Sequence, residues 1–308
     1  MNKKHVLGIV GPTASGKTAL SIPLAQKLNT EILCMDSMQV YRHMDIGTAK
    51  PSAEEQKLIP HHLIDLCDPE ESFTVTDYAN VATPILDRLN NPLLVGGTGL
   101  YLQALSTSAS FGTVKSDEVI RNELHKIAEE KGVLYLHNEL QKVDPVSASK
   151  FHPNDVRRVV RALEVYRLTG TPISAQQDAE DQSPYRFTLF GIMLPREILY
   201  ERVNNRVDMM IRNGLVDEVR MLQKRGIPAN ATCMQGLGYK ELYEYLGGTL
   251  SLADAVDLIK LRTRHFAKRQ LTWFKRDQRI HWLDGSLHPD RLLSEAIEIL
   301  ERTKSNHE

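Results

Sequence analysis

The stretch Gly11-Pro12-Thr13-Ala14-Ser15-Gly16-Lys17-Thr18 follows a short apolar run, Val6–Val10, and precedes a segment with helical character. It has the pattern G-x-x-x-x-G-K-[ST] of a phosphate-binding P-loop, in the strand–loop–helix context that the motif requires. Its glycines let backbone N–H groups turn toward a phosphate, and the helix that starts near Thr18 directs its positive dipole end at the same anion. The stretch therefore predicts an α/β fold that binds a diphosphate or a triphosphate.

Two side chains of this loop have separate predicted tasks. Lys17 supplies a mobile cation for the phosphates, and Thr18 supplies a hydroxyl for Mg²⁺. The motif does not distinguish a nucleotide from another diphosphate. A small-molecule kinase that uses ATP is therefore one hypothesis, and an enzyme that uses a different diphosphate is another.

Apolar runs with strand character recur along the chain and alternate with helical patterns, which predicts a parallel sheet flanked by helices. Ligands of such sheets lie at the carboxyl ends of the strands. The P-loop, Asp36 and the turn Gly96–Gly99 each follow a predicted strand, so we expect them to meet at one edge. The predicted strands are Val6–Val10, Glu31–Met35, Leu93–Val95, Thr188–Leu194 and His281–Leu283, and the predicted helices are Ala19–Leu28, Asp77–Leu89, Leu199–Arg225 and Leu252–Lys275.

The strand signal disappears between Lys115 and Tyr185. Helical patterns take its place at Asp117–Glu130, Val133–Val143 and Asn154–Thr169, followed by a polar loop. We predict a discontinuous P-loop NTPase-like α/β core formed by residues 1–114 and 186–308. Residues 115–185 are predicted to form an inserted, all-helical domain.

The composition is that of an ordinary globular protein, with 308 residues, 42% hydrophobic and 25% charged, and a formal net charge of −1. The three cysteines are far apart and form no C-x-x-C pair, so neither a zinc site nor a disulfide framework is indicated. The first apolar run is too short for a signal sequence, and no stretch has membrane-spanning length. We expect a cytoplasmic protein without a membrane segment, acting as a monomer.

Basic residues are concentrated in two places despite the neutral total charge. Residues 260–279 contain eight Lys or Arg against the single acid Asp277, and a second group comprises Arg157, Arg158, Arg161 and Arg167. Local basic patches on a neutral protein indicate an oriented polyanionic partner. The alternative is that each run is a solvated face of a helix.

Asp36 follows the second predicted strand and allows two interpretations. It can be a general base beside the P-loop, or it can serve as a Mg²⁺ ligand or a simple cap. The turn Gly96–Gly99 offers the hydroxyl of Thr98, although tight packing alone also explains its glycines. Arg202 and Arg206 lie one helical turn apart, which fits either a surface face or a pair of groups that hold a diphosphate.

The segment Lys268–Arg276 interleaves cations with aromatic residues. Nucleic-acid surfaces combine these features, because phosphates need charge and splayed bases need flat apolar faces. Trp273 and Phe274 can equally form the core side of an amphipathic helix.

Taken together, these segments resemble the bacterial tRNA dimethylallyltransferase (tRNA isopentenyltransferase) family. The matching pieces occur in family order and span nearly the whole chain. They are Gly11–Thr18, Asp36–Tyr41, Asp45–Pro51, Gly96–Tyr101, His152–Asp155 with the arginines that follow, Gly236–Lys240 and Lys268–Trp273.

The resemblance implies that the P-loop binds the diphosphate of dimethylallyl diphosphate together with Mg²⁺, and does not hydrolyse ATP. The acceptor implied is N6 of the adenosine 3′ of the anticodon (position 37) in tRNAs that read codons starting with U. Asp36 would be the base, with Thr98 and Arg206 as further catalytic residues. The diphosphate-binding residues implied are Gly11, Pro12, Thr13, Ala14, Ser15, Gly16, Lys17 and Thr18, with Thr18 as the metal ligand.

The same resemblance implies contacts with the anticodon stem-loop and extrusion of the target base into the site. The implied tRNA-binding residues are Asp36, Ser37, Met38, Gln39, Thr98, Arg121, Arg157, Arg158, Arg161, Gln235, Lys240, Lys268, Arg269, Gln270, Trp273 and Lys275. At position 235 the chain has Gln where some relatives have a cation. A nucleotide-gated RNA-binding switch is a further alternative, but the sequence lacks the N-K-x-D and D-x-x-G segments of GTPases.

Overall fold

A computed structural model describes residues 3–107, 114–176 and 183–305 of the chain. It divides into two compact units. The α/β unit comprises Met1–Leu105 and Pro184–Glu308, and the inserted unit comprises Ser106–Ser183. The sequence predicts 115–185 for the insertion. Residues 177–182, which form most of the predicted polar loop, lie outside the described residues.

The α/β unit is built on a six-stranded sheet in which all neighbouring strands run parallel. The strand order is β3-β2-β4-β1-β5-β6. This confirms the predicted class, a P-loop-like parallel sheet flanked by helices. The strands are β1 (Lys4–Val10), β2 (Ile32–Met35), β3 (His61–His62), β4 (Leu93–Gly96), β5 (Tyr185–Met193) and β6 (Ile280–Asp284).

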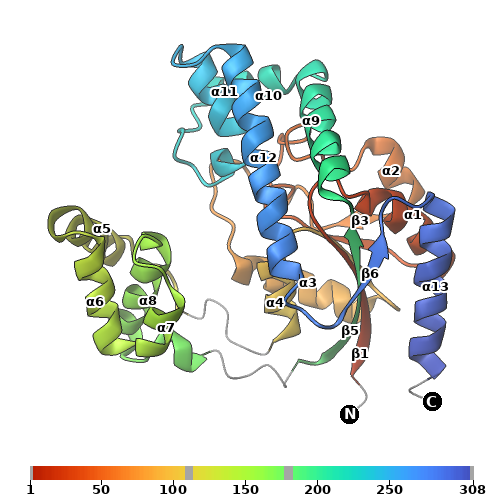
Figure 1. The fold of residues 1–308 in the computed structure, drawn as a ribbon, viewed down its shortest axis with the longest axis horizontal. Coiled ribbons are helices and arrows are strands. Elements are labelled where there is room, and N and C mark those ends of the chain that lie inside the picture. Colours follow the sequence, from red (N-terminus) through yellow and green to blue (C-terminus); the bar gives the residue numbers. More distant parts are fainter. Residues whose placement is uncertain (1–2, 108–113, 177–182, 306–308) are drawn as a thin grey trace. The chain divides into compact units, whose positions relative to one another are not determined.

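Helices cover both faces of the sheet (Figure 1). Alternate strand residues point to opposite faces, so Val6 and Val10 pack with α3 and α4, whereas Leu7 and Ile9 pack with α1 and α13. The helices of this unit are α1 (Lys17–Leu28), α2 (Ala53–Leu58), α3 (Val75–Arg88), α4 (Gly99–Ser106), α9 (Arg196–Arg212), α10 (Leu215–Lys224), α11 (Tyr239–Leu246), α12 (Leu252–Phe274) and α13 (Pro289–Ser305).

Helices α9 to α12 form a further layer with their own apolar core at the edge where strands β1, β2 and β4 end (Figure 1). The single predicted helix over Leu199–Arg225 is wrong, because two helices occupy that range. Gly214 separates them with φ 99°, a left-handed conformation that ends α9 and allows α10 to start in a new direction. The prediction of α12 as one long helix is confirmed, and Phe274 lies in the core under the sheet.

Among its described residues, the regular elements of the inserted unit are all helical. They are α5 (Glu118–Lys131), α6 (Val133–Val143), α7 (Pro145–Lys150), α8 (Val156–Thr169) and the short 3-10 helix η1 (Ile173–Gln176). Leu124, Leu136, Leu140 and Leu163 lie in its core. Pro145 starts α7, because proline at the first helical position loses no internal hydrogen bond. None of the helices in the described part of the chain is long and apolar enough to span a membrane.

Candidate active site

A cavity of about 1520 Å³ lies at the carboxyl ends of β1, β2 and β4. Its walls come from segments far apart in the sequence. These include the P-loop, the residues after β2, the loop 45–53, the turn after β4, residues 235–237, and helices α9 and α12. The parallel sheet thus brings together the P-loop, Asp36 and Thr98, as the strand pattern predicts.

The backbone of the P-loop has the unusual conformations that its sequence allows. Gly11 has φ 144° and Gly16 has φ 100°, and a Cβ at Gly11 would lie 3.1 Å from the carbonyl oxygen of Ile192. Helix α1 starts at Lys17, directly after the second glycine. The hydroxyl of Ser15 is buried and has no hydrogen-bond partner among the described residues. The loop therefore presents backbone amides and an unpaired hydroxyl next to a helix N-terminus.

Lys17 lies against its own loop. Its ammonium donates to the carbonyl oxygens of Gly11 at 3.0 Å and Pro12 at 2.7 Å. Although the side chain keeps some solvent contact, the surrounding walls desolvate the ammonium and lower its pKa to about 7. The positive charge of Arg206 lowers this pKa further, and the negative charge of Asp36 raises it.

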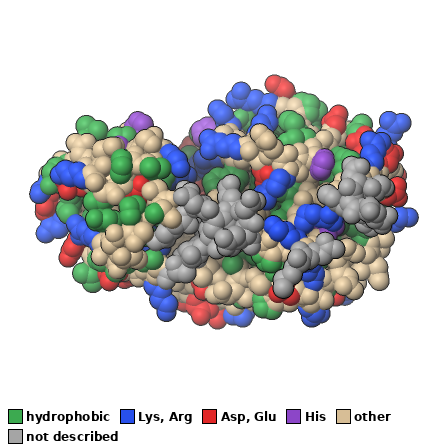
Figure 2. Space-filling view, turned by 90° about the horizontal axis from the view of Figure 1, so that it is seen from below, with side chains coloured by type: hydrophobic (Ala, Val, Ile, Leu, Met, Phe, Trp, Pro, Cys, Tyr) green, Lys and Arg blue, Asp and Glu red, His purple; other side chains and the backbone are tan. Residues whose placement is uncertain are grey.

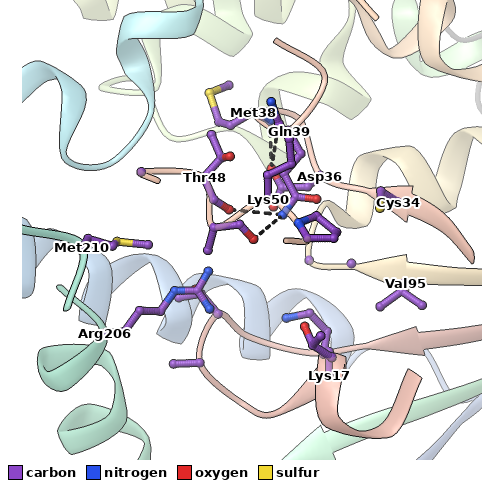
Figure 3. A pocket seen from close by; sticks show the side chains of 18 of the residues that line it. Lys17, Cys34, Asp36, Met38, Gln39, Thr48, Lys50, Val95, Arg206 and Met210 are labelled. Carbon is purple, nitrogen blue, oxygen red and sulfur yellow. Dashed lines mark hydrogen bonds between the residues drawn. The ribbon is translucent and has the colours of Figure 1, made fainter. Parts of the chain in front are cut away.

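Arg206 extends from α9 into the same space. Figure 3 shows its guanidinium and the ammonium of Lys17 pointing toward one another across the cavity, with Asp36 on another wall. Among the residues that the structure describes, none forms a hydrogen bond or an ion pair with Arg206. Burial lowers its pKa, and Asp36 acts in the opposite direction. Two desolvated cations without an anionic partner within hydrogen-bond distance define a site for an anion.

Asp36 stands at the end of β2, where its backbone turns. One carboxylate oxygen, Oδ1, accepts hydrogen bonds from the backbone N–H groups of Met38 at 2.8 Å and Gln39 at 3.4 Å. No described residue donates to the other oxygen, Oδ2. The carboxylate is therefore held in one orientation while keeping one oxygen available to a ligand in the cavity.

Thr98 follows β4, the neighbour of β2 in the sheet. Its Oγ1 accepts a hydrogen bond from the backbone N–H of Ser37 at 3.1 Å, and its own N–H donates to the carbonyl of Met35. A Cβ at Gly96 would lie 2.0 Å from that carbonyl oxygen, so the two strand ends approach closely only because position 96 is glycine. The Thr98 hydroxyl thus lies beside the residue that follows Asp36, and no described residue accepts its proton.

Gln270 on α12 is buried inside the site. Its Oε1 accepts from the backbone N–H of Thr13 at 2.9 Å, and its Nε2 donates to the carbonyl of Gly97 at 2.9 Å. The sequence predicts a tRNA contact for this residue. In the structure its amide is bonded to two loops of the protein, at 7% exposure, and the tRNA contact stays a prediction. Trp273, one turn further along, packs against Gly99 and stays 40% exposed.

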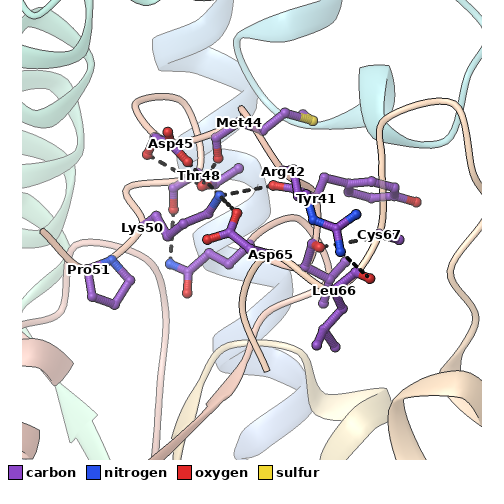
Figure 4. Close-up of polar contacts among 12 residues, drawn as sticks. Tyr41, Arg42, Met44, Asp45, Thr48, Lys50, Pro51, Asp65, Leu66 and Cys67 are labelled. Carbon is purple, nitrogen blue, oxygen red and sulfur yellow. Dashed lines mark hydrogen bonds and ion pairs between the residues drawn. The ribbon is translucent and has the colours of Figure 1, made fainter. Parts of the chain in front are cut away.

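The loop Asp45–Pro51 is fixed by one buried cation. Lys50 donates to the carbonyl of Tyr41 at 2.9 Å and forms ion pairs with Asp45 at 2.5 Å and Asp65 at 2.7 Å, as Figure 4 shows. Gln39 donates from its side-chain amide to the carbonyls of Thr48 and Ala49. Gln39 is thus used in part to shape the cavity wall.

The sequence did not indicate Glu218, on α10, as a functional residue. Its carboxylate accepts hydrogen bonds from the backbone N–H groups of Asp45, Ile46 and Gly47, at 2.8, 2.8 and 3.1 Å. A lone Glu on an amphipathic helix gives no signal for such a contact 171 or more residues away. Glu218 therefore fixes the cavity wall from outside the cavity.

The remaining predicted RNA contacts of the α/β unit are on the surface. Gln235, Lys240, Lys268, Arg269 and Lys275 are exposed, and Gln235 and Arg269 also line the cavity. On the face shown in Figure 2, Lys and Arg side chains occur in several groups with acidic side chains between them. That face is therefore not a surface of a single sign.

The arginines of the inserted unit fall into two kinds. Arg121 and Arg161 form ion pairs with the fully buried carboxylate of Glu164, at 2.9 and 2.7 Å. Burial alone would raise the pKa of Glu164. Hydrogen bonds from Arg161, from the backbone N–H of Asp117 and from Arg121 outweigh this effect, so the pKa is lowered overall. Arg157 and Arg158 are exposed on α8. The structure thus gives Arg121 and Arg161 a role in packing that the sequence does not indicate.

The fold and the cavity define a P-loop α/β enzyme with an anion site beside a carboxylate. Two family models match the chain, IPP transferase over residues 39–277 and isopentenyl transferase over residues 4–65. A tRNA dimethylallyltransferase of Halalkalibacterium halodurans is 46% identical over 288 residues, covering 92% of this chain and 91% of the relative. One of Desulforudis audaxviator is 50% identical over 281 residues, 90% of each chain.

Two solved structures are also similar. The full-length tRNA isopentenylpyrophosphate transferase of Bacillus halodurans is 43% identical with a TM-score of 0.74, covering 99% of this chain and 100% of that one. A eukaryotic dimethylallyltransferase described as acting on tRNA is 31% identical with a TM-score of 0.82, covering 98% and 80%. The chain belongs to the tRNA dimethylallyltransferase family of prenyltransferases. The resemblance seen in the sequence motifs is confirmed.

Proposed function

We propose that this enzyme transfers the dimethylallyl group of dimethylallyl diphosphate to N6 of the adenosine 3′ of the anticodon, position 37, in tRNAs that read codons starting with U. The products are N6-dimethylallyladenosine and diphosphate. Family membership supports the reaction class. The observation that carries the proposal is the pair of cations, Lys17 and Arg206, facing one cavity that also holds the available oxygen of Asp36.

The donor diphosphate is assigned to the P-loop side of this cavity. Lys17 and Arg206 would each contact its oxygens, and the amides that begin α1 would donate to it. Both cations are desolvated, so their attraction for an anion is larger than on an open surface. As the allylic C–O bond breaks, negative charge grows on the departing diphosphate, and these groups stabilise it.

Mg²⁺ fits the donor set at the start of α1. The Thr18 hydroxyl is exposed and has no hydrogen-bond partner among the described residues, and no group of three His, Cys, Asp or Glu is found among them that could hold a metal. Mg²⁺ is commonly held by one or two protein oxygens together with substrate phosphates, so Thr18 and the diphosphate would suffice. When bound, the ion would neutralise charge on the leaving diphosphate.

Asp36 is the proposed general base. In the reaction, the N6 lone pair forms a bond to the allylic carbon, the carbon–oxygen bond breaks, and its electron pair leaves with the diphosphate. The proton lost from N6 passes to Asp36 Oδ2, while Oδ1 remains bonded to the backbone of Met38. Thr98, with Oγ1 already accepting from Ser37, would direct its own proton at the adenine.

The proposed RNA surface consists of exposed cations and one exposed aromatic residue. Lys268, Arg269, Trp273 and Lys275 on α12 combine charge with a flat apolar face, which suits phosphates and an unstacked base. Gln235 and Lys240 lie on the same unit, and Arg157 and Arg158 add exposed charge on the inserted unit. The reacting adenosine must leave its stack to enter the cavity. We further propose that the protein acts in the cytoplasm as a monomer.

The deciding experiment is nucleoside mass analysis of unmodified tRNA after incubation with the protein, Mg²⁺ and dimethylallyl diphosphate, without ATP. The expected result is N6-dimethylallyladenosine in a tRNA that reads a U-starting codon, and none when the acceptor adenosine is replaced. Absence of product together with ATP consumption in a parallel assay would favour the small-molecule kinase that the P-loop alone leaves open. A digest that retains the flanking nucleotides would locate the modified position.

A further inference from the structure

Gln270 occupies an unusual place for a polar side chain. It is buried, and the two ends of its amide join two loops that are 84 residues apart in the chain, the P-loop at Thr13 and the turn after β4 at Gly97. Each loop carries residues of the proposed site, since the P-loop would hold the diphosphate and Thr98 would face the adenine. One side chain of α12 therefore contacts both halves of the catalytic arrangement.

The helix and the turn pack closely around this contact. A Cβ at Gly97 would lie 2.1 Å from Gln270 Nε2, and a Cβ at Gly99 would lie 2.2 Å from Trp273 Nε1. Helix α12 thus packs against the turn at Gly97 and Gly99, the two glycines that flank Thr98. A displacement of α12 at this point would strain the turn, because closely packed groups transmit strain.

The other side of the same stretch of helix faces outward with charge. Lys268 and Arg269, directly before Gln270, are exposed, and Arg269 also lines the cavity. In the proposed function these cations bind the RNA backbone. RNA bound there would restrain α12 one residue away from the amide that holds Thr13 and Gly97.

The P-loop holds its own lysine in place. Lys17 donates to the carbonyls of Gly11 and Pro12, so the orientation of these two carbonyls determines where the ammonium lies and where its third N–H can point. Thr13, whose N–H is held by Gln270, is the residue that follows Pro12. The position of Thr13 therefore bears on where the loop holds the ammonium that would meet the anion.

We propose that Gln270 is a positioning residue that couples RNA binding on α12 to diphosphate binding in the P-loop, so that each ligand increases the affinity for the other. This inference rests on the proposed function. Coupling between two binding sites is reciprocal and is typically five- to 150-fold, so the effect must be the same in whichever order the ligands are added.

The test uses isothermal titration calorimetry on the full chain, with inorganic diphosphate plus Mg²⁺ and an unmodified anticodon stem-loop RNA, a pair that cannot react. For the wild type we expect saturating diphosphate to tighten RNA binding about fivefold or more, and RNA to tighten diphosphate binding by the same factor. In Gln270→Met, which keeps the size and removes both hydrogen bonds, the factor should fall to about one.

Gly97→Ala supplies a second variant that keeps Gln270. Its new methyl group would meet the movable end of the Gln270 side chain and displace the amide, so the coupling factor should again fall toward one. Thr272→Ala, on the exposed side of the same helix, is the matched control and should keep the wild-type factor.

A factor of one in the wild type, or an unchanged factor in either variant, would overturn the coupling inference. If Gln270→Met does not fold, Gly97→Ala decides the question. The proposed function has its own separate outcome. A wild-type protein that makes dimethylallyladenosine but binds the two ligands independently refutes the coupling alone, whereas a wild type that makes no product refutes the function.

Discussion

The hydroxyl of Tyr239 donates a hydrogen bond to Glu218 Oε1 at 2.6 Å, and the same oxygen accepts from the backbone of Gly47. A Cβ at Gly47 would lie 2.6 Å from the ring of Tyr239, so the aromatic side chain packs directly under the loop that it helps to fix. Burial and the charge of Glu218 raise the pKa of Tyr239 well above its usual value, which keeps the phenol protonated as a donor. One wall of the active-site cavity is thus anchored from α10 and α11.

Glu218→Ala is expected to destabilise the folded protein by about 2–3 kcal/mol, because three backbone N–H groups lose their acceptor. Glu218→Gln keeps one acceptor oxygen and should cost less. Chemical denaturation measures both. Asp217→Asn changes the neighbouring, exposed carboxylate and should leave the denaturation midpoint unchanged. Equal midpoints for Glu218→Ala and the wild type would contradict this account.

Asp36→Asn is expected to reduce turnover by about 10²–10⁴-fold, the usual contribution of a general base. Asparagine retains an oxygen for the Met38 N–H, so the local backbone should persist and both ligands should still bind. Single-turnover kinetics with radiolabelled donor, together with RNA binding assays, separate the two effects. Unchanged turnover would remove Asp36 from the role of base.

Binding of diphosphate is expected to take up protons at Lys17. In the free protein its pKa is about 7, because burial and the nearby charge of Arg206 oppose the ammonium, and a bound anion must raise that pKa. Affinity should therefore weaken as the pH rises above 7, with uptake of about half a proton at pH 7. Calorimetry in buffers of different ionisation enthalpy measures the uptake.

Lys17→Arg isolates this contribution, since the titration of diphosphate itself is common to both proteins. The variant should lose the additional proton uptake, whereas an identical uptake in both proteins would assign the proton to another group.

The same lowered pKa of Lys17 affects the stability of the ligand-free protein. Between about pH 7 and 10.5 the unfolded chain binds more protons at Lys17 than the folded one, so its contribution to stability increases as the pH rises through that window.

Exchanging arginines on the inserted unit should produce two different phenotypes. Replacing the exposed pair, Arg157→Gln with Arg158→Gln, should weaken RNA binding and make the slope of log K against log salt concentration shallower by about one to two. The affinity for diphosphate should not change. Arg161→Gln should instead lower the unfolding free energy by on the order of 1–3 kcal/mol, because it leaves buried Glu164 with fewer partners. RNA titrations at several salt concentrations and denaturation curves distinguish them. Loss of diphosphate binding in the double variant would contradict the assignment.

Local patterns were sufficient for the P-loop, the parallel sheet and the family, because a motif and its flanking strand and helix are contiguous in sequence. They were not sufficient where a side chain acts at long range. Gln270 resembles an exposed residue in a basic helix, yet it is held inside by Thr13 and Gly97. Glu164, partner of Arg121 and Arg161, likewise looks like any helix carboxylate until α5 and α8 are packed together.

The break between α9 and α10 shows the limit of periodicity itself. Apolar spacing continues through Leu199–Arg225, but the single Gly214 with a positive φ changes the direction of the chain. Short elements such as β3 escape prediction for a related reason. A strand of two residues is too short to show an alternating apolar pattern. His61 and His62 form a strand only because β2 offers them an open edge.

The P-loop, Thr98 and Asp36 follow β1, β4 and β2, three strands that are immediate neighbours in the sheet. Adjacent strands are about 4.8 Å apart, so the hydrogen-bonded ladder determines the spacing between the phosphate loop, the hydroxyl and the carboxylate. By contrast, apolar side chains that line the cavity, such as Met210 and Phe266, come from α9 and α12. An engineer who wishes to admit a longer allylic chain can therefore change these two side chains and leave Arg206 and Gln270, which the same helices carry, in place.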